Sequence, residues 1–341
     1  MLNERLKRSI TTKTTQRFIA AVLLLLVGGA AGFLLRGAYE ERQENGSFVE
    51  QREGEFKLIN PLLECDAAST AMRNRELRPF QDKVESSVKY FIGSGFASNV
   101  TVYFRELHDG HWFSIGETER FTPASLRKVP LMITLLKHAE RDKGFLAQRV
   151  PFRLSRDFNE NQNIKPSQAM VPGREYVVGD LLYRMIAYSD NNAFMLLTKF
   201  VDPAALENVY TTLRIGRPDI PQDDQFLSVQ TYASFFRVLY NATYLNKEMS
   251  DLALDMLSKS EFRSGIVAGV PPEITVAHKF GEHSDQDRSV QLHDCGIVYY
   301  PRHPYLLCVM SKGPNFETLD DVIEGVSRVV FAEVDRQQRN H

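Results

Sequence analysis

Cysteine is scarce in this chain, with three among 341 residues: Cys65, Cys295 and Cys308. So few cysteines exclude a disulfide-based scaffold, and the sequence holds neither a CxxC pair nor a Cys/His cluster with zinc-finger spacing. We therefore assign no metal site and no cofactor. We interpret Cys295 and Cys308 as buried free thiols, because a tight hairpin around residues 301–304 would pair residue 295 with about residue 310.

An excess of charge of one sign is absent as well. The chain has 41 Lys and Arg against 43 Asp and Glu, which gives a net charge of -2 at pH 7. No broad electrostatic attraction to nucleic acid is expected from this balance, so nucleic acid is not among the expected partners. The hydrophobic share of 43% and the charged share of 25% are ordinary for a globular protein with a sizeable core.

The one long apolar run lies near the N-terminus, at residues 18–35 (FIAAVLLLLVGGAAGFLL). Its length of about 18 residues is close to what a bilayer-spanning helix needs, and five Lys and Arg residues precede it. We predict a cytoplasmic tail at 1–17, a single transmembrane anchor at 18–35, a polar linker at 36–78 and an extracytoplasmic domain at 79–336. A cleaved signal peptide is the alternative, although its apolar core is normally shorter.

Beyond the linker, the spacing of apolar residues predicts regular elements. Helices are expected at 80–91, from 122 onward with Thr122 as N-cap and Pro123 at the first position, and at 178–201, 229–244 and 319–335. Strands are expected at 99–106, 112–116, 274–280, 294–300 and 305–310. Strands near both ends with helices between them predict an α+β fold, in which an antiparallel sheet is flanked by helices and joined by a helical lobe.

Three short motifs follow one another along this domain: SLRK at 125–128, SDN at 189–191 and KFG at 279–281. On a helix, residues three apart share a face, so Lys128 can reach the Ser125 hydroxyl and take its proton. Burial and a second cation, Lys279, would help Lys128 to lose its own proton. The backbone N–H groups of Ser125 and Glu282 are the expected donors to a tetrahedral oxyanion.

The ordered set of motifs resembles the signature of class A β-lactamases and penicillin-binding proteins. The segments 119–130, 171–182, 187–193 and 278–282 extend the resemblance, which covers about residues 79–336. It implies a two-lobed serine hydrolase with the active site between the lobes, acting on a β-lactam or a cell-wall peptide through an acyl-enzyme at Ser125. In that reading Ser189 relays a proton to the leaving nitrogen, Asn191 and Lys279 hold the substrate, and Gly281 lets it approach the strand.

Two departures from the family pattern leave alternatives open. The class A enzymes deacylate with a glutamate in an E-x-x-L-N context, whereas residues 213–226 contain no such motif and offer only Asp219, Asp223 and Asp224 as acids. Phe280 also replaces the hydroxyl residue of K-T-G, which usually helps to bind the substrate carboxylate. A slow-deacylating D,D-peptidase or penicillin-binding protein is therefore one alternative, and a non-catalytic binding or sensor domain on the same fold is another.

Overall fold

The computed structural model describes residues 50–54, 56–65, 77–108, 110–213 and 228–339. The predicted anchor at 18–35, most of the predicted linker and the acids Asp219, Asp223 and Asp224 lie outside the described residues. No helix within those described ranges is long and apolar enough to cross a membrane. The domain boundaries proposed for the N-terminal segments stay predictions.

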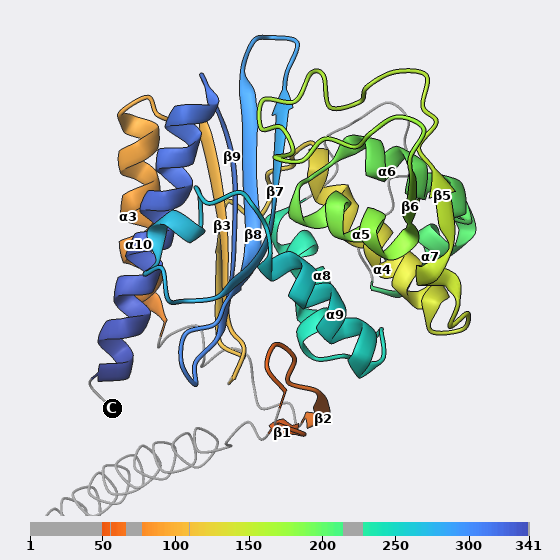
Figure 1. Cartoon of the computed structure of the whole chain (residues 1–341). Coiled ribbons are helices and arrows are strands. Elements are labelled where there is room, and N and C mark those ends of the chain that lie inside the picture. The colour runs from red at the N-terminus through yellow and green to blue at the C-terminus, as the bar shows by residue number, and fades with distance from the viewer. Residues whose placement is uncertain (1–49, 55, 66–76, 109, 214–227, 340–341) are drawn as a thin grey trace, which may run out of the picture. The chain divides into compact units, whose positions relative to one another are not determined.

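Among the described residues, the strands of the five-stranded sheet come from both ends of the domain, and most of the helices lie between them in sequence (Figure 1). The helices are α3 (Arg78–Gly93), α4 (Lys128–Ala139), α5 (Val178–Ala187), α6 (Asn191–Leu197), α7 (Pro203–Thr212), α8 (Val229–Tyr240), α9 (Lys247–Ser258) and α10 (Phe316–Arg339). The strands are β1 (Glu50–Arg52), β2 (Leu62–Cys65), β3 (Asn99–Glu106), β4 (Trp112–Ile115), β5 (Arg149–Pro151), β6 (Glu175–Val177), β7 (Val276–Ser284), β8 (Val290–Val298) and β9 (Tyr305–Gly313). The 3₁₀ turns are η1 (Ala124–Arg127), η2 (Phe145–Ala147), η3 (Thr198–Phe200) and η4 (Val267–Gly269).

The central sheet has five antiparallel strands in the order β4-β3-β9-β8-β7. Successive side chains of a strand point to opposite faces, so its apolar residues divide between two cores. Phe104 and Val309 belong to the core beneath α3 and α10, whereas Tyr103 and Met310 belong to the core shared with the helical lobe. The predicted α+β fold, with an antiparallel sheet, flanking helices and a helical lobe, is confirmed.

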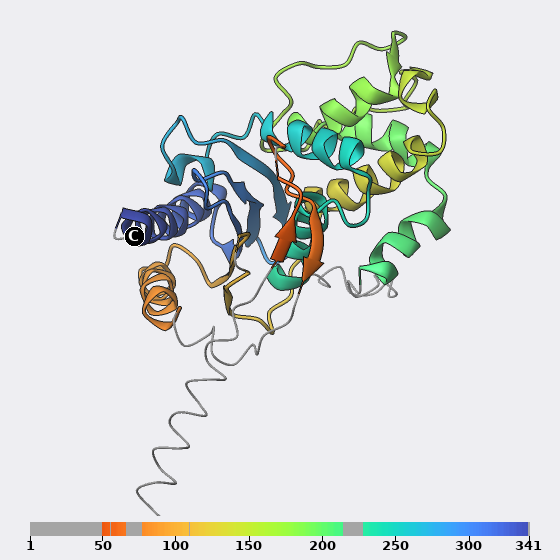
Figure 2. The same cartoon turned by 90° about the horizontal axis from the view of Figure 1, so that it is seen from below.

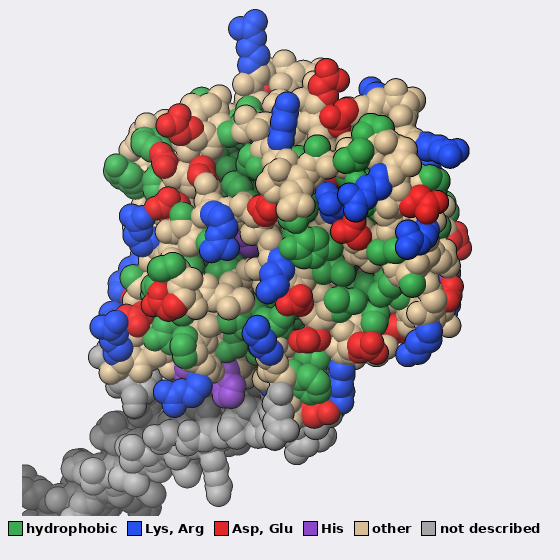
Figure 3. Space-filling model, in the orientation of Figure 1, with side chains coloured by type: hydrophobic (Ala, Val, Ile, Leu, Met, Phe, Trp, Pro, Cys, Tyr) green, Lys and Arg blue, Asp and Glu red, His purple; other side chains and the backbone are tan. Residues whose placement is uncertain are grey.

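Helices α3 and α10 cover one face of the sheet and lie side by side in both views (Figures 1 and 2). Their apolar stripes, which include Phe80 and Val84 on α3 and Val326 on α10, are fully buried. Helix α8 contacts the opposite face and joins it to the lobe built from α4, α5, α6, α7 and α9. Acidic and basic side chains are interspersed over the face seen in Figure 3, in keeping with the net charge of -2.

Two predicted helices differ from those observed. The helix expected at 178–201 is divided into α5 and α6, because Ser189 has a positive φ of 53° and the Asp190 carboxylate caps α6 by accepting from the N–H groups of Asn192 and Ala193. The helix expected from Thr122 begins instead as the 3₁₀ turn η1 and becomes α-helical at Lys128. Thr122 is not its N-cap, because Pro123 holds that position in η1 and Arg127 holds it in α4, neither with a side-chain cap hydrogen bond.

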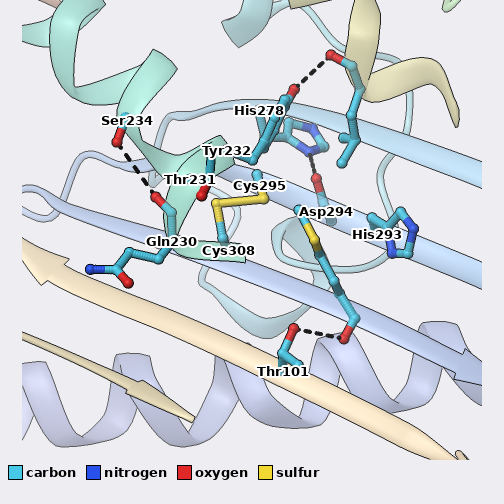
Figure 4. The surroundings of a disulfide bond; sticks show 12 residues. Thr101, Gln230, Thr231, Tyr232, Ser234, His278, His293, Asp294, Cys295 and Cys308 are labelled. Carbon is cyan, nitrogen blue, oxygen red and sulfur yellow. Dashed lines mark hydrogen bonds and ion pairs between the residues drawn. A yellow bond between two sulfur atoms is a disulfide. The ribbon is translucent and has the colours of Figure 1, made fainter. Parts of the chain in front are cut away.

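The interpretation of Cys295 and Cys308 as free thiols is wrong. The register of β8 and β9 pairs Cys295 with Cys308, and the two residues form a disulfide on the face that Tyr232 of α8 covers (Figure 4). The connection between the strands spans residues 299–304, so it is longer than the turn expected from Pro301 and Pro304. The two extra residues move the partner of residue 295 from about 310 to 308.

Removal of this disulfide is expected to lower the free energy of unfolding by about 2–4 kcal/mol, because the bond restricts the unfolded chain. The bond closes a sequence separation of 13 residues. Urea unfolding of the Cys295→Ala/Cys308→Ala variant, compared with oxidised and reduced wild type, measures the effect. Equal stability of oxidised and reduced wild type would contradict a stabilising role for the bond, and a loss seen in the alanine variant alone would indicate lost packing.

Candidate active site

Ser125 lies on a short turn that is held by a hydrogen bond within the turn and by another from helix α8. The turn η1 is closed by the Leu126 N–H donating to the Pro123 carbonyl at 2.8 Å, and the buried Tyr232 hydroxyl of α8 donates to the Leu126 carbonyl at 3.1 Å. Ala124, directly before Ser125, has a φ of 48°, a region that costs a non-glycine residue free energy and that clusters at functional sites. The partly exposed Ser125 is therefore presented on a constrained backbone just ahead of α4.

Lys128 connects Ser125 to the SDN motif. Its Nζ lies 3.0 Å from Ser125 Oγ, 3.0 Å from Ser189 Oγ and 2.6 Å from the Ser189 carbonyl oxygen. The side chain is 2% exposed, and burial together with the charge of Lys279 holds the pKa of Lys128 well below its usual range. A neutral amine can donate to both Ser189 oxygens and still accept the Ser125 proton through its lone pair.

Lys279, on strand β7 of the central sheet, extends this series of hydrogen bonds. Its Nζ donates to Ser189 Oγ at 3.0 Å and to the Phe280 carbonyl at 2.9 Å, and no part of the side chain is exposed. Burial lowers the pKa of Lys279 to about 7, although the carboxylates of Asp294 and Glu282 act in the opposite direction. The structure thus joins Ser125, Lys128, Ser189 and Lys279 in one series of hydrogen bonds. The first and last of these residues are 154 positions apart in sequence.

Asn191 lies at the opening of the site and is positioned by a loop at residues 157–164. Its N–H donates to Asn159 Oδ1 at 2.7 Å and its Nδ2 to the Phe158 carbonyl at 3.1 Å. The same loop supplies Gln162, whose Nε2 donates to the Ser189 carbonyl at 3.0 Å. These loop residues were not predicted. The amide-rich sequence NENQN at 159–163 is the signal that could have pointed to them.

A cavity of about 190 Å³ opens above Ser125. The described residues that line it are Ser125, Phe158, Asn161, Gln162, Asn163, Asn191, Glu282, His283, Ser284 and Phe316. Of the predicted site residues, Ser125, Asn191 and Glu282 therefore face the cavity, whereas Lys128, Ser189 and Lys279 are buried behind it. The cavity is of a size that admits the reacting part of a small acyl substrate.

Gly281 brings the edge strand β7 against the turn that carries Ser125. A Cβ at this position would lie 3.1 Å from Leu126 Cγ and 3.2 Å from both the Leu126 nitrogen and the Pro123 oxygen, so glycine permits the close approach. Phe280 does not occupy the place of a substrate-binding hydroxyl. Its ring is 2% exposed and stacks on Phe262, with 4.4 Å between the ring centroids.

The histidines on β7 and β8 have structural partners. His278 Nδ1 lies 2.8 Å from Asp294 Oδ1, and His293 Nε2 lies 3.1 Å from the Thr122 carbonyl oxygen, to which it donates. Burial lowers the pKa of His293 to about 4, which keeps this ring neutral at physiological pH. No group of three or more His, Cys, Asp or Glu residues among those described is arranged to hold a metal ion.

The low pKa of Lys279 has a consequence for stability. In the unfolded chain a lysine titrates near ~10.4, so between pH 7 and about 10 the unfolded state binds more protons than the folded state. The free energy of unfolding should therefore rise with pH over this range. We expect Lys279→Met to reduce that slope in urea unfolding between pH 7 and 9.5, whereas Lys89→Met, at an exposed position, should leave it unchanged. An unaltered slope in Lys279→Met would contradict the lowered pKa.

Comparison with known proteins agrees with this fold. A model of the β-lactamase enzyme family matches residues 83–334, well over half of the chain. The β-lactamase CTX-M-25 of Escherichia coli is 25% identical over 234 residues, which are 62% of this chain and 76% of that protein. Among solved structures, a PBP-A variant in an acyl-enzyme complex with penicillin G has a TM-score of 0.63 at 21% identity, over 75% of this chain and 97% of that one.

The TLA-3 extended-spectrum β-lactamase is similar as well, with a TM-score of 0.65 at 16% identity, over 74% of this chain and 98% of that one. At these identities the solved structures show the shared fold, and the family model adds the assignment of the sequence itself. The resemblance found in the three motifs is thereby confirmed. The chain belongs to the β-lactamase enzyme family and is a β-lactamase-like serine hydrolase.

Proposed function

We propose that the protein forms an acyl-enzyme at Ser125 and acts on a β-lactam or a peptidoglycan-type amide. The observation that carries this proposal is the hydrogen-bonded series from Ser125 through Lys128 and Ser189 to Lys279. Neutral Lys128 takes the proton of Ser125 Oγ as this oxygen bonds to the substrate carbonyl carbon. The N–H groups of Ser125 and Glu282 stabilise the oxyanion that develops there.

Collapse of the tetrahedral intermediate breaks the amide C–N bond. The proton held by Lys128 passes through Ser189 Oγ to the leaving nitrogen, and Lys279 keeps the Ser189 hydroxyl oriented by donating to its oxygen. Asn191, which lines the cavity, orients the acyl part of the substrate. Attack of water on the ester carbon then releases the acid, and the proton returns to Ser125 Oγ.

The comparisons support the substrate class. A similar solved structure is that of a PBP-A variant acylated by penicillin G, and the curated relative is a β-lactamase. These two kinds of protein differ in how fast water removes the acyl group. Residues 213–226 contain no E-x-x-L-N motif, and the acids Asp219, Asp223 and Asp224 of this stretch lie outside the described residues. Fast and slow deacylation are therefore to be distinguished by experiment.

The test is to incubate the full chain with a fluorescent penicillin and to follow the intact mass over time, with peptide mass spectrometry to locate the adduct. We expect a stoichiometric adduct on Ser125 that Ser125→Ala lacks. An adduct that persists identifies a slow-deacylating penicillin-binding enzyme, and one that decays with product release identifies a β-lactamase. Absence of any adduct from folded wild-type protein would refute acylation by β-lactams and favour a binding or sensor domain.

We also propose that residues 18–35 anchor the chain in a membrane with its catalytic domain outside the cytoplasm. The apolar run and the preceding basic residues support this arrangement, as does the disulfide between Cys295 and Cys308, since such bonds persist in oxidising compartments. In bacterial cells, the full chain should stay in the membrane fraction after an alkaline wash, and protease added to spheroplasts should degrade it. Recovery of the chain in the soluble cytoplasmic fraction would refute this arrangement.

A further inference from the structure

The side chain of Glu282 has no role in the mechanism proposed above, which uses only its backbone N–H. Its carboxylate lies at the edge of the cavity, where Oε1 accepts from the Asn163 N–H at 2.9 Å and from the Ile164 N–H at 3.0 Å. Its second oxygen is buried and has no hydrogen-bond partner among the described residues. Burial raises the pKa of Glu282, although the N–H groups of Ile164 and Asn163 and the charge of Lys279 act in the opposite direction.

Cationic groups that would attract an anion near Glu282 are absent from the described cavity lining or already engaged. Neither a lysine nor an arginine lines the cavity among the described residues, and His283, which does, lies against Asp285 with 3.5 Å between Nε2 and Oδ1. The Lys279 amino group is buried behind the cavity and donates to Ser189 Oγ and to the Phe280 carbonyl. Phe280 offers no hydroxyl, since its ring packs against Phe262.

Glu282 borders the cavity in which Ser125 would meet a substrate. Ser125 and Glu282 both line this cavity, whereas Ser189 and Lys279, which donates to Ser189 Oγ at 3.0 Å, are buried behind it. Lys279 and Glu282 are three residues apart on β7, so their side chains point to opposite faces of the strand. A charge on the leaving group of a substrate in this cavity therefore interacts with the Glu282 carboxylate.

We propose that Glu282 makes the site selective for acyl donors whose leaving group carries an ammonium group in preference to a carboxylate. This inference rests on the proposed acyl transfer at Ser125 and specifies its substrate class as amine-bearing peptide amides or esters. The carboxylate attracts a cation and repels an anion across the cavity wall, so a direct hydrogen bond is not required. In a partly buried cavity, such an interaction is screened less than on an open surface.

The test compares two esters with one acyl part, the N-benzoylglycine esters of 3-(aminomethyl)phenol and of 3-hydroxybenzoic acid. With either ester, the bond from Ser125 Oγ to the acyl carbon forms, the bond to the phenol oxygen breaks, and this oxygen takes the Ser125 proton. The readout is the ratio of kcat/KM for the ammonium ester to that for the carboxylate ester, each corrected for uncatalysed hydrolysis. We expect Glu282→Gln, in which the amide oxygen can still accept from Asn163 and Ile164, to lower this ratio about tenfold relative to wild type.

Two further variants separate charge from structure. Glu282→Ala should lower the ratio as Glu282→Gln does, whatever its effect on the loop at 157–164. Glu261→Gln removes an exposed carboxylate that accepts from the Ser167 hydroxyl at 2.7 Å and does not line the cavity, so its ratio should equal that of wild type. An unchanged ratio in both Glu282 variants would overturn the inference.

Binding of the two corresponding amides to the full chain carrying Ser125→Ala, which cannot be acylated, is measured by calorimetry with and without Glu282→Gln and keeps this inference separate from the proposed function. If neither ester acylates Ser125, the proposed acyl transfer fails for these donors, and the amides still decide the selectivity. Tighter binding of the ammonium amide that disappears in Glu282→Gln supports the inference. Equal affinities for the two amides in the chain that carries Ser125→Ala alone overturn it.

Discussion

Replacement of Lys128 by methionine is expected to slow acylation of Ser125 by on the order of 10³-fold, within the range that a positioned general base contributes. Methionine has a similar length and suits the buried site, so the fold should persist while the base is lost. The variant also removes the contacts of Nζ with Ser125 Oγ and with both oxygens of Ser189. Stopped-flow measurement of adduct formation with a fluorescent penicillin gives the rate constant.

Two variants sharpen this result. Lys128→Arg keeps a cation at the site but cannot lose its proton, so it should not restore the rate if Lys128 acts as a base. Lys137→Met changes a lysine on the same helix whose Nζ donates to the Tyr244 carbonyl at 2.7 Å, away from the cavity, and it should acylate as wild type does. A rate for Lys128→Met within a few-fold of wild type would show that another group takes the Ser125 proton.

Gly281→Val should lower the acylation rate by about 10²-fold, comparable to the loss of one oxyanion donor. The added side chain would press on Leu126 and Pro123, which lie 3.1–3.2 Å from the first atom it introduces. The turn η1 would then move away from β7 and would separate the N–H groups of residues 125 and 282, which we propose as the oxyanion donors. Displacements of this kind of about 1 Å can cost such a factor without loss of the fold.

The matched control is Gly93→Val, because no heavy atom other than those of its chain neighbours and its own helix backbone lies within 4 Å of a Cβ at this position. It should leave both the acylation rate and the unfolding midpoint close to those of wild type. Circular dichroism and urea unfolding of Gly281→Val establish that its fold is intact. If Gly281→Val is folded and acylates at the wild-type rate, the close approach of β7 to η1 is not required for acylation.

The fold class could be predicted because the apolar spacing of the long elements is strong. Strand β3 was predicted with its observed bounds, and β9 from the correct residue. The C-terminal end of β7 was missed, because Glu282, His283 and Ser284 are polar residues that extend the strand beyond the core. The first residues of β8, 290–293, were missed as well. Helix α9, which Asn246 caps through Met249, was not predicted at all.

In the candidate site, only the residues that belong to short sequence motifs could be predicted. The SLRK, SDN and KFG motifs named the residues that the structure joins by hydrogen bonds. The contact of Glu282 with the loop at 163–164 spans 119 residues of sequence, and no local pattern encodes it. Likewise, the pairing of Cys295 with Cys308 depends on the length of the loop between β8 and β9, and the positions of the prolines alone predicted a loop that is too short.

The close approach of η1 to β7 also bears on aggregation. A sheet edge with free N–H and C=O groups is a template on which another chain can pair. One edge of this sheet, β4, has only four residues, and the other, β7, is approached by η1 at Gly281 and by the backbone N–H groups of residues 163 and 164 at Glu282. The segments that shape the catalytic cavity therefore shield the longer edge, so variants that displace them to widen the cavity would expose a nine-residue strand to intermolecular pairing.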